Sequence, residues 1–271
     1  MNRAPMPQPL SSSMNPLAPV IDRLYTSEIS QDPYPHYYLE DVFPTEYYQS
    51  MLRYLPDSAV YQNLYAVTDL KLDHFRHRDQ RDLNEGWTDM LPDEIRSFWI
   101  AFDEWFMGPE LAQAVLQTFA EPLRERFGDE RAWPEVSIEA QFIRHRAGYF
   151  LGPHSDLYTK LVVLLLYLAP DDSLAHLGTS LYRPRDPGFT CPDSKHYSFD
   201  DFVKVKTAPY KPNSLLAFMR SDRSFHGLEP LSEQDVATGN RDLIQYVLHD
   251  KQVRGEQLRR RRLAATKEAG E

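Results

Sequence analysis

Residues 152–168 read GPHSDLYTKLVVLLLYL, and this stretch decides how the rest of the chain is interpreted. Its second half is a continuous apolar run that predicts a buried strand. Its first half places His154 and Asp156 two residues apart, so on an extended backbone both side chains project to the same face. An imidazole and a carboxylate on one face suit Fe(II) or Mn(II) better than a thiolate-type zinc site.

A His-x-Asp pair alone is a weak signal in a chain with nine histidines, so a third ligand is needed. His226 stands in a β-rich run, RSFHGLEP at 223–230, that follows the predicted strand 214–218. Two histidines and one carboxylate occupy one face of an octahedron and leave three positions open. The sequence therefore predicts a metal site made of His154, Asp156 and His226.

Arg241 opens the apolar stretch RDLIQYVL, fifteen residues after His226. A charged side chain at the mouth of a strand that is otherwise apolar requires a partner. Its planar guanidinium binds a carboxylate through two parallel hydrogen bonds. That carboxylate belongs either to a ligand or to one of the chain's own acidic residues, and the residue pattern alone leaves both interpretations open.

Short β-rich runs separated by Pro, Gly and Asp turns extend outward from this centre. They span 136–145, 159–168, 178–183, 202–207, 214–218, 224–228 and 242–248. Many short strands with turn signals between them predict a sandwich or barrel rather than a parallel sheet with crossovers. No internal repeat is present.

The N-terminal half has a different character. A short strand is predicted at 36–43, and helices begin near Pro44, Pro92 and Pro109, with aromatic residues at helical spacing that predict packing against a sheet. We therefore expect a Pro/Ser-rich disordered lead over residues 1–20 and one domain over 21–250, helical at 35–130 and β-rich at 132–250. Residues 251–271, with seven Lys or Arg and three Glu, predict a basic tail that is flexible or helical.

Composition limits the partners and the location. The net charge of −10 argues against nucleic acid or an anionic membrane as a partner. The single cysteine, Cys191, excludes an internal disulfide framework and is interpreted as incidental. No secretory leader or membrane-spanning run is found, so a cytoplasmic protein is expected; the oligomeric state is not predicted.

The order of these motifs resembles the Fe(II)- and 2-oxoglutarate-dependent dioxygenase superfamily, in the style of its prolyl-hydroxylase-like branch. The resemblance covers roughly residues 135–250 and includes His154-Ser-Asp156, His226 and the Gly239-x-Arg241 strand. It implies a mostly β fold with flanking helices: a double-stranded β-helix (jelly-roll, cupin-like) core with the N-terminal helices packed on the major sheet.

The resemblance also implies a chemistry. Fe(II), 2-oxoglutarate and O2 would hydroxylate a substrate C–H bond, with succinate and CO2 as co-products and ascorbate as a possible reductant. Arg241 would hold the C5 carboxylate of 2-oxoglutarate. Halogenating relatives replace the metal-binding carboxylate with a small residue, so Asp156 favours hydroxylation.

One departure from the family concerns the strand before the metal motif. Relatives often have Tyr nine residues before the first ligand, where this chain has His145. Strand alternation puts Gln141, Ile143 and His145 on the inward face. His145 and Gln141 are therefore candidate contacts of the co-substrate or the substrate, although an ordinary hydrogen-bonded histidine fits the pattern equally well. A second departure, Leu177-Gly178 in place of two glycines, should not affect the metal site.

The substrate is less well defined by the sequence. A long polar loop at 184–197 is expected to cover the pocket mouth, and 62–81, rich in charge and imidazole, to form either its opposite wall or a solvated surface. These segments suit an amino acid, a peptide residue or another small polar metabolite. Two alternatives remain: a cupin-like metal dioxygenase that does not use 2-oxoglutarate, and a non-catalytic jelly-roll binding module.

Overall fold

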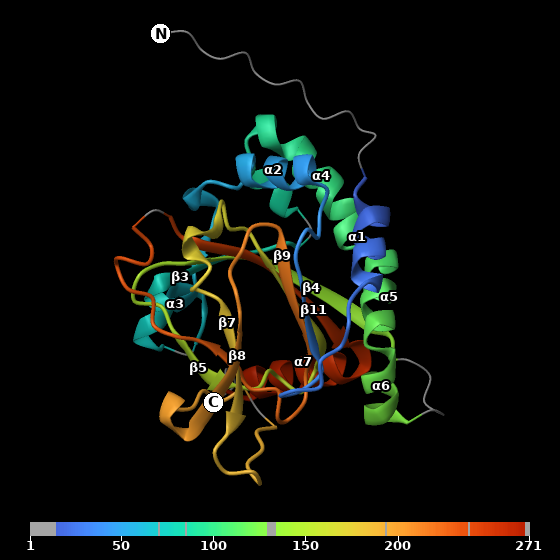
Figure 1. Ribbon diagram of the computed structural model, residues 1–271, viewed down its shortest axis with the longest axis vertical. Coiled ribbons are helices and arrows are strands. Elements are labelled where there is room, and N and C mark those ends of the chain that lie inside the picture. The colour runs from blue at the N-terminus through green and yellow to red at the C-terminus, as the bar shows by residue number, and fades with distance from the viewer. Residues whose placement is uncertain are drawn as a thin grey trace.

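The computed structural model describes residues 15–69, 71–84, 86–128, 134–192, 194–237 and 239–268, with side chains as far as residue 260. Two antiparallel sheets face each other, and helices cover the outside of the larger one (Figure 1). The helices are α1 (Leu17–Tyr25), α2 (Thr45–Arg53), α3 (Leu64–Val67), α4 (Asp93–Phe106), α5 (Pro109–Thr118), α6 (Ala120–Phe127) and α7 (Lys251–Glu268). The predicted double-stranded β-helix with flanking helices is confirmed.

The larger sheet has the strand order β1-β9-β6-β11-β4-β3-β2. Its strands are β1 (His36–Leu39), β2 (Gln62–Asn63), β3 (Arg78–Asp82), β4 (Val136–His145), β6 (Lys160–Tyr167), β9 (Ser214–Met219) and β11 (Arg241–Asp250). The central strand β11 alternates strictly: Ile244 and Tyr246 face the helices, whereas Leu243 and Val247 face the smaller sheet. Because both faces of this strand are covered by apolar layers, its register is strongly fixed.

The smaller sheet has the order β5-β10-β7-β8. Its strands are β5 (Leu151–His154), β7 (Thr179–Pro184), β8 (Phe202–Ala208) and β10 (His226–Leu228). An apolar layer between the two sheets includes Leu181 and Leu228 from this side and Ile143 and Leu165 from the other. This layer fixes the distance between the sheets, and the two candidate metal-ligating histidines lie on β5 and β10.

The predicted aromatic stripe is confirmed as core packing. Trp99, Phe102 and Phe106 of α4 are fully buried and contact the outer face of the larger sheet through Phe142 and Tyr246. Figure 1 shows α1, α5 and α6 in a row along the same side of the molecule. Among the described residues, none of the helices has both the length and the apolar character needed to cross a bilayer.

The chain ends and the segment 62–81 differ from the sequence-based boundaries. Helix α1 begins at Leu17 and buries Val20, so the predicted end of the lead at residue 20 falls inside this helix; residues 1–14 of the lead lie outside the described residues. The basic tail forms α7 at least to Glu268. Residues 62–82 extend the larger sheet by two strands, β2 and β3, which the sequence did not predict because they carry almost no apolar alternation.

Candidate metal and co-substrate site

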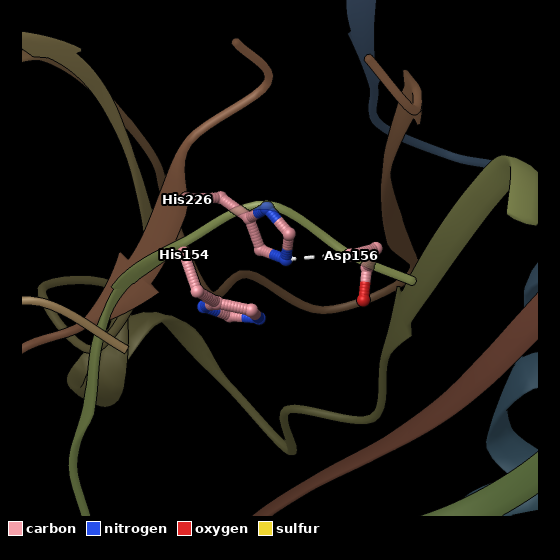
Figure 2. Close-up of side chains that lie close together, drawn as sticks. All are labelled: His154, Asp156 and His226. Carbon is pink, nitrogen blue, oxygen red and sulfur yellow. Dashed lines mark ion pairs between the residues drawn. The ribbon is translucent and has the colours of Figure 1, made fainter. Parts of the chain in front are cut away.

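His154 and His226 lie directly opposite each other on neighbouring strands. His154 ends β5 and His226 begins β10, and the two residues are register partners with ring centroids 4.3 Å apart. Asp156 follows two residues after His154 and turns toward the same point (Figure 2). One potential ligand atom from each residue lies within 4.8 Å of the others, and all three residues are 5–6% exposed. The structure therefore brings together the three residues predicted from the sequence.

Hydrogen bonds fix the orientation of both imidazoles. Nδ1 of His154 lies 3.0 Å from the carbonyl oxygen of Gly152, and Nδ1 of His226 lies 3.1 Å from that of Ser224. A carbonyl only accepts, so each Nδ1 must carry the proton and each Nε2 must present a lone pair. Burial lowers the pKa of both histidines, which keeps them neutral as metal ligands.

The two carboxylate oxygens of Asp156 have different surroundings. Oδ1 accepts a 2.6 Å hydrogen bond from Nζ of Lys160. Oδ2 is buried without a hydrogen-bond partner and lies 3.6 Å from Nε2 of His226. Burial raises the pKa of Asp156, but Lys160 and the two histidines outweigh it, so the pKa is lowered and the carboxylate is ionised. A buried, ionised oxygen without a partner beside two imidazole lone pairs fits a divalent cation of the Fe(II) or Mn(II) type.

Arg241 lies at the start of β11 and is 1% exposed. Its guanidinium donates to the carbonyl oxygen of Leu177 (2.6 Å), to Oγ1 of Thr179 (3.0 Å) and to Nδ1 of His145 (3.0 Å). No Asp or Glu of the described residues forms an ion pair with it. Three of its five N–H groups are therefore satisfied by neutral groups. A buried cation of this kind favours an anionic ligand.

His145 and Tyr149 each offer a free polar atom beside Arg241. The rings stack with centroids 4.1 Å apart. Because Arg241 donates to Nδ1 of His145, the neutral ring carries its proton on Nε2, and this atom is buried without a partner. The hydroxyl of Tyr149 is likewise buried without a partner. Tyr149 was not predicted from the sequence, where its only signal was its place just before the metal motif.

A single cavity of about 390 Å³ joins these groups. It is lined by the metal triad, by Arg241, His145 and Tyr149, and by Ile143, Gln141 and Gln245 on the floor formed by β4 and β11. The predicted inward face of β4 is confirmed. The amide of Gln141, however, donates to Oδ1 of Asp82 (2.6 Å) and accepts from Arg78 (3.5 Å). Gln141 also lies four residues along the ladder from the Arg241–His145 pair, about 13 Å away.

The two flanking segments both reach this cavity. Ser194 and His196 of the loop 184–197 line it, as do Leu64, Phe75, Arg78 and Gln80 of the predicted opposite wall. The His196 ring lies 4.9 Å from that of His154. Cys191 does not line the cavity; it is buried in a small cluster with Phe202 and Phe225. The loop is thus anchored by Cys191, and its C-terminal part, with Ser194 and His196, faces the metal site.

Glycines next to the ligands allow the strands to approach closely. A Cβ at Gly227, directly after His226, would lie 2.5 Å from the carbonyl oxygen of Leu151 on β5. A Cβ at Gly152, two residues before His154, would lie 2.5 Å from the carbonyl oxygen of Tyr197 in the loop. Both contacts are far too short for a side chain, so these positions accept only glycine without a backbone shift.

Comparison with solved structures identifies the fold. A prolyl hydroxylase from Trichoplax adhaerens, in complex with a hypoxia inducible factor oxygen degradation domain peptide fragment, aligns with a TM-score of 0.51 and 14% identity, over 88% of this chain and 91% of that chain. A Pseudomonas putida prolyl-4-hydroxylase aligns with 17% identity over 86% and 98% of the two chains, with a TM-score of 0.45. HygX from Streptomyces hygroscopicus, with nickel and 2-oxoglutarate bound, aligns with 13% identity over 85% and 87%, with a TM-score of 0.43. No protein-family model matches the chain, and no curated protein matches it in sequence.

Proposed function

We propose that this chain, which has the fold of a prolyl hydroxylase, is an Fe(II)- and 2-oxoglutarate-dependent oxygenase that hydroxylates a C–H bond. The observation that carries the proposal is the pairing, in one cavity, of a buried two-histidine, one-carboxylate cluster with a buried arginine that lacks a described acidic partner. The first group suits the metal and the second suits the distal carboxylate of the co-substrate. The substrate is an amino acid, a peptide residue or another small polar metabolite.

Nε2 of His154, Nε2 of His226 and Oδ2 of Asp156 would hold the Fe(II) ion. Bound Fe(II), with 2-oxoglutarate and O2, supplies an oxidation that yields succinate and CO2 and inserts oxygen into a substrate C–H bond. The protein contributes ligand orientation through the carbonyls of Gly152 and Ser224. The ionised carboxylate of Asp156 leaves no place for a halide at that position, which supports hydroxylation over halogenation.

Arg241 would grip the C5 carboxylate of 2-oxoglutarate with its two remaining N–H groups. The Nε2–H group of His145 and the hydroxyl of Tyr149 line the same cavity without partners and would complete the contacts to that carboxylate. Ile143 and Leu243 supply apolar surface for the methylene groups. Ascorbate would act only as an external reductant, because no residue of the cavity is assigned to bind it.

An anaerobic titration tests the proposal. Fe(II) followed by 2-oxoglutarate should produce a weak metal-to-ligand charge-transfer band in the green, which requires both groups to bind at one site. The band should be absent in Asp156→Ala and should need much more 2-oxoglutarate in Arg241→Met. If metal binds but no band appears at any 2-oxoglutarate concentration, a cupin-like dioxygenase without a keto acid is favoured instead.

Turnover separates the enzyme from a binding module. Under O2 the wild-type protein should release succinate from 2-oxoglutarate, and a screen of amino acids, short peptides and small acids should raise that rate. His154→Ala should release none. A band without any succinate, in the presence of the full screen, would support a jelly roll that binds these ligands and does not react.

A further inference from the structure

Arg78 is a second arginine of the cavity, and it too lacks a described acidic partner. Its side chain lines the cavity from β3, the strand next to β4. Its Nε is buried without a hydrogen-bond partner, and the hydrogen bond from its terminal nitrogen to Oε1 of Gln141 is long at 3.5 Å. None of the described Asp or Glu residues forms an ion pair with it. A planar cation with unused donors therefore faces the space beside the metal triad.

Arg78 and Arg241 occupy different places in one row of the larger sheet. Arg78 pairs with His145 across β3 and β4, and His145 pairs with Arg241 across β4 and β11. The two arginines are thus two strands apart, with backbones roughly 10 Å from each other. Arg241 is enclosed at the deep end, whereas Arg78 is half-buried on the open side. A co-substrate held by Arg241 leaves Arg78 available for a second ligand.

The backbone at Arg78 is held rigidly. Nδ2 of Asn63 donates to the carbonyl oxygens of Arg76 (3.0 Å) and Arg78 (3.2 Å) and to the carboxylate of Asp79 (2.8 Å). The backbone amide of Arg146 donates to the carbonyl oxygen of His77 at 2.9 Å. These bonds fix the start of β3, a strand that lies between β4 and the short edge strand β2 and has little apolar packing of its own, so Arg78 is presented from a defined position.

Two other charged side chains on the cavity wall, Lys160 and Glu139, already have partners within the protein. Lys160 is hydrogen-bonded to Asp156, and Glu139 is paired with Arg254 of α7. Gln141 is held by Asp82 and turns its amide oxygen toward Arg78. Apolar surface beside Arg78 comes from Leu64 and Phe75. The unpaired charge on this side of the cavity is therefore the positive charge of Arg78, which lies next to a small apolar wall.

We propose that Arg78 binds a carboxylate of the substrate that the enzyme oxidises. The substrate is then a small carboxylic acid, such as a free amino acid, rather than an internal residue of a polypeptide. This inference rests on the proposed oxygenase function, because it assigns the second ligand of the same cavity. A guanidinium recognises a carboxylate through two parallel hydrogen bonds, which matches the unused Nε–H and terminal N–H donors of Arg78. The terminal carboxylate of a short peptide offers the same chemistry, and the experiment below distinguishes a peptide C-terminus from a free amino acid.

Calorimetry under anaerobic conditions tests this binding without requiring turnover. The probes are the proteinogenic L-amino acids, their carboxamides, and tripeptides with free or amidated C-termini, each added to protein loaded with Fe(II) and 2-oxoglutarate. At least one free acid should bind, its carboxamide should not, and Arg78→Gln should weaken the acid about ten- to a hundredfold. Binding of tripeptide acids alone would assign a peptide C-terminus and overturn the choice of a free amino acid. Equal binding of acid and amide, no binding by any acid, or unchanged binding in Arg78→Gln would overturn the inference as a whole.

Matched variants test whether the effect is specific to the position and the shape of Arg78. Arg76→Gln removes an arginine of the same segment that does not line the cavity and should bind the acid as the wild-type protein does. Arg78→Lys keeps the charge but loses the planar guanidinium with its paired donors, so it should bind the acid more tightly than Arg78→Gln and less tightly than the wild-type protein. If Arg78→Gln instead weakens 2-oxoglutarate and leaves the acid unaffected, Arg78 serves the co-substrate and the inference is wrong. If metal and 2-oxoglutarate fail to bind to the wild-type protein, the proposed function fails, whereas the acid titration repeated without them still reports on Arg78.

Discussion

Lys160, the first residue of β6, donates a 2.6 Å hydrogen bond to Oδ1 of Asp156, which lies shortly before this strand in the sequence. The two side chains are 12% and 9% exposed. The ammonium and a metal ion would thus share one buried carboxylate, each on its own oxygen. In the metal-free protein, Lys160 is the group that compensates this charge.

Replacing Lys160 with Met should therefore destabilise the metal-free protein by about 3 kcal/mol, because one partner of a buried ion pair is removed. Mn(II) should then raise the melting temperature more in Lys160→Met than in the wild-type protein, since the metal becomes the only compensating charge. Differential scanning calorimetry with and without Mn(II) measures both effects. Lys251→Met, which removes a lysine paired with Glu135 at the surface, is the control. Equal Mn(II) shifts in all three proteins would contradict this charge compensation.

Arg241→Met should abolish the stabilisation that 2-oxoglutarate provides. A ligand that binds only the folded state stabilises it by about 2.7 kcal/mol at about a hundred times its Kd. The wild-type protein loaded with Mn(II) should show this shift, and Arg241→Met should not at the same concentration. The Mn(II) shift itself should persist, because Arg241 is not one of the triad residues. Arg183→Met, a surface arginine paired with Asp32, is the control, and a retained 2-oxoglutarate shift in Arg241→Met would show that the co-substrate binds elsewhere.

The sequence predicted most strands and the pair of ligands His154 and Asp156 from short-range patterns, whereas the third ligand, His226, was inferred from a separate β-rich run far along the chain. The ligands His154 and Asp156 are two residues apart, and the strand from Val136 to His145 alternates between apolar and polar residues as far as Phe142, so its inward face could be assigned before its partners were known. Arg241 was recognisable as a charge at the start of a buried strand. What could not be assigned was its partner, because a carboxylate from anywhere in the chain would have satisfied the same pattern.

The residues that the sequence did not predict depend on pairing across the fold. The strand Arg78–Asp82 reads RDQRD, which carries no apolar alternation and resembles a solvated surface; only its ladder with β4 places Arg78 in the cavity. Strand β5 is four residues long and contains Gly152 and Pro153, which weaken any strand signal. The role of Tyr149 could not be predicted either, because only the fold shows that its ring stacks on His145 and that its hydroxyl is buried without a partner.

Asp103 should make the protein less stable at neutral pH than at mildly acidic pH. It accepts a 2.9 Å hydrogen bond from Nε1 of Trp87, and burial raises its pKa to about 6. Since the folded-state pKa lies above the unfolded value, this group stabilises the fold at low pH and loses that contribution as the pH rises through about 6. Asp103→Asn keeps an acceptor for Trp87 and removes the charge. It should be more stable than the wild-type protein at about pH 8, with a smaller difference at about pH 5.

Urea denaturation at the two pH values measures this effect. Glu104→Gln changes the neighbouring position and should not alter the pH dependence. A difference between Asp103→Asn and the wild-type protein that stays constant with pH would mean that packing, and not ionisation, accounts for the change.

His196 should control how well substrate oxidation is coupled to 2-oxoglutarate decarboxylation. Its ring lies 4.9 Å from that of His154 and 6.3 Å from that of Phe75, and the residue lies near the C-terminal end of the loop 184–197 on the cavity wall. Burial, with a contribution from His74, lowers its pKa to about 4, so the ring is neutral at physiological pH. His196→Ala should leave Fe(II) and 2-oxoglutarate binding intact, because His196 belongs to neither set of contacts. The yield of hydroxylated product per succinate should fall about tenfold, because the substrate is less firmly positioned.

Product and succinate are quantified in the same reaction, with the acid found to bind in the calorimetric screen as substrate. His176→Ala, an exposed histidine paired with Asp235, is the matched control and should couple normally. Shortening the loop 184–197 should act in the same direction as His196→Ala, since it removes the same wall of the cavity. A parallel loss of succinate and product in both variants would instead indicate that the loop supports folding, because a residue that only positions the substrate leaves the uncoupled reaction in place.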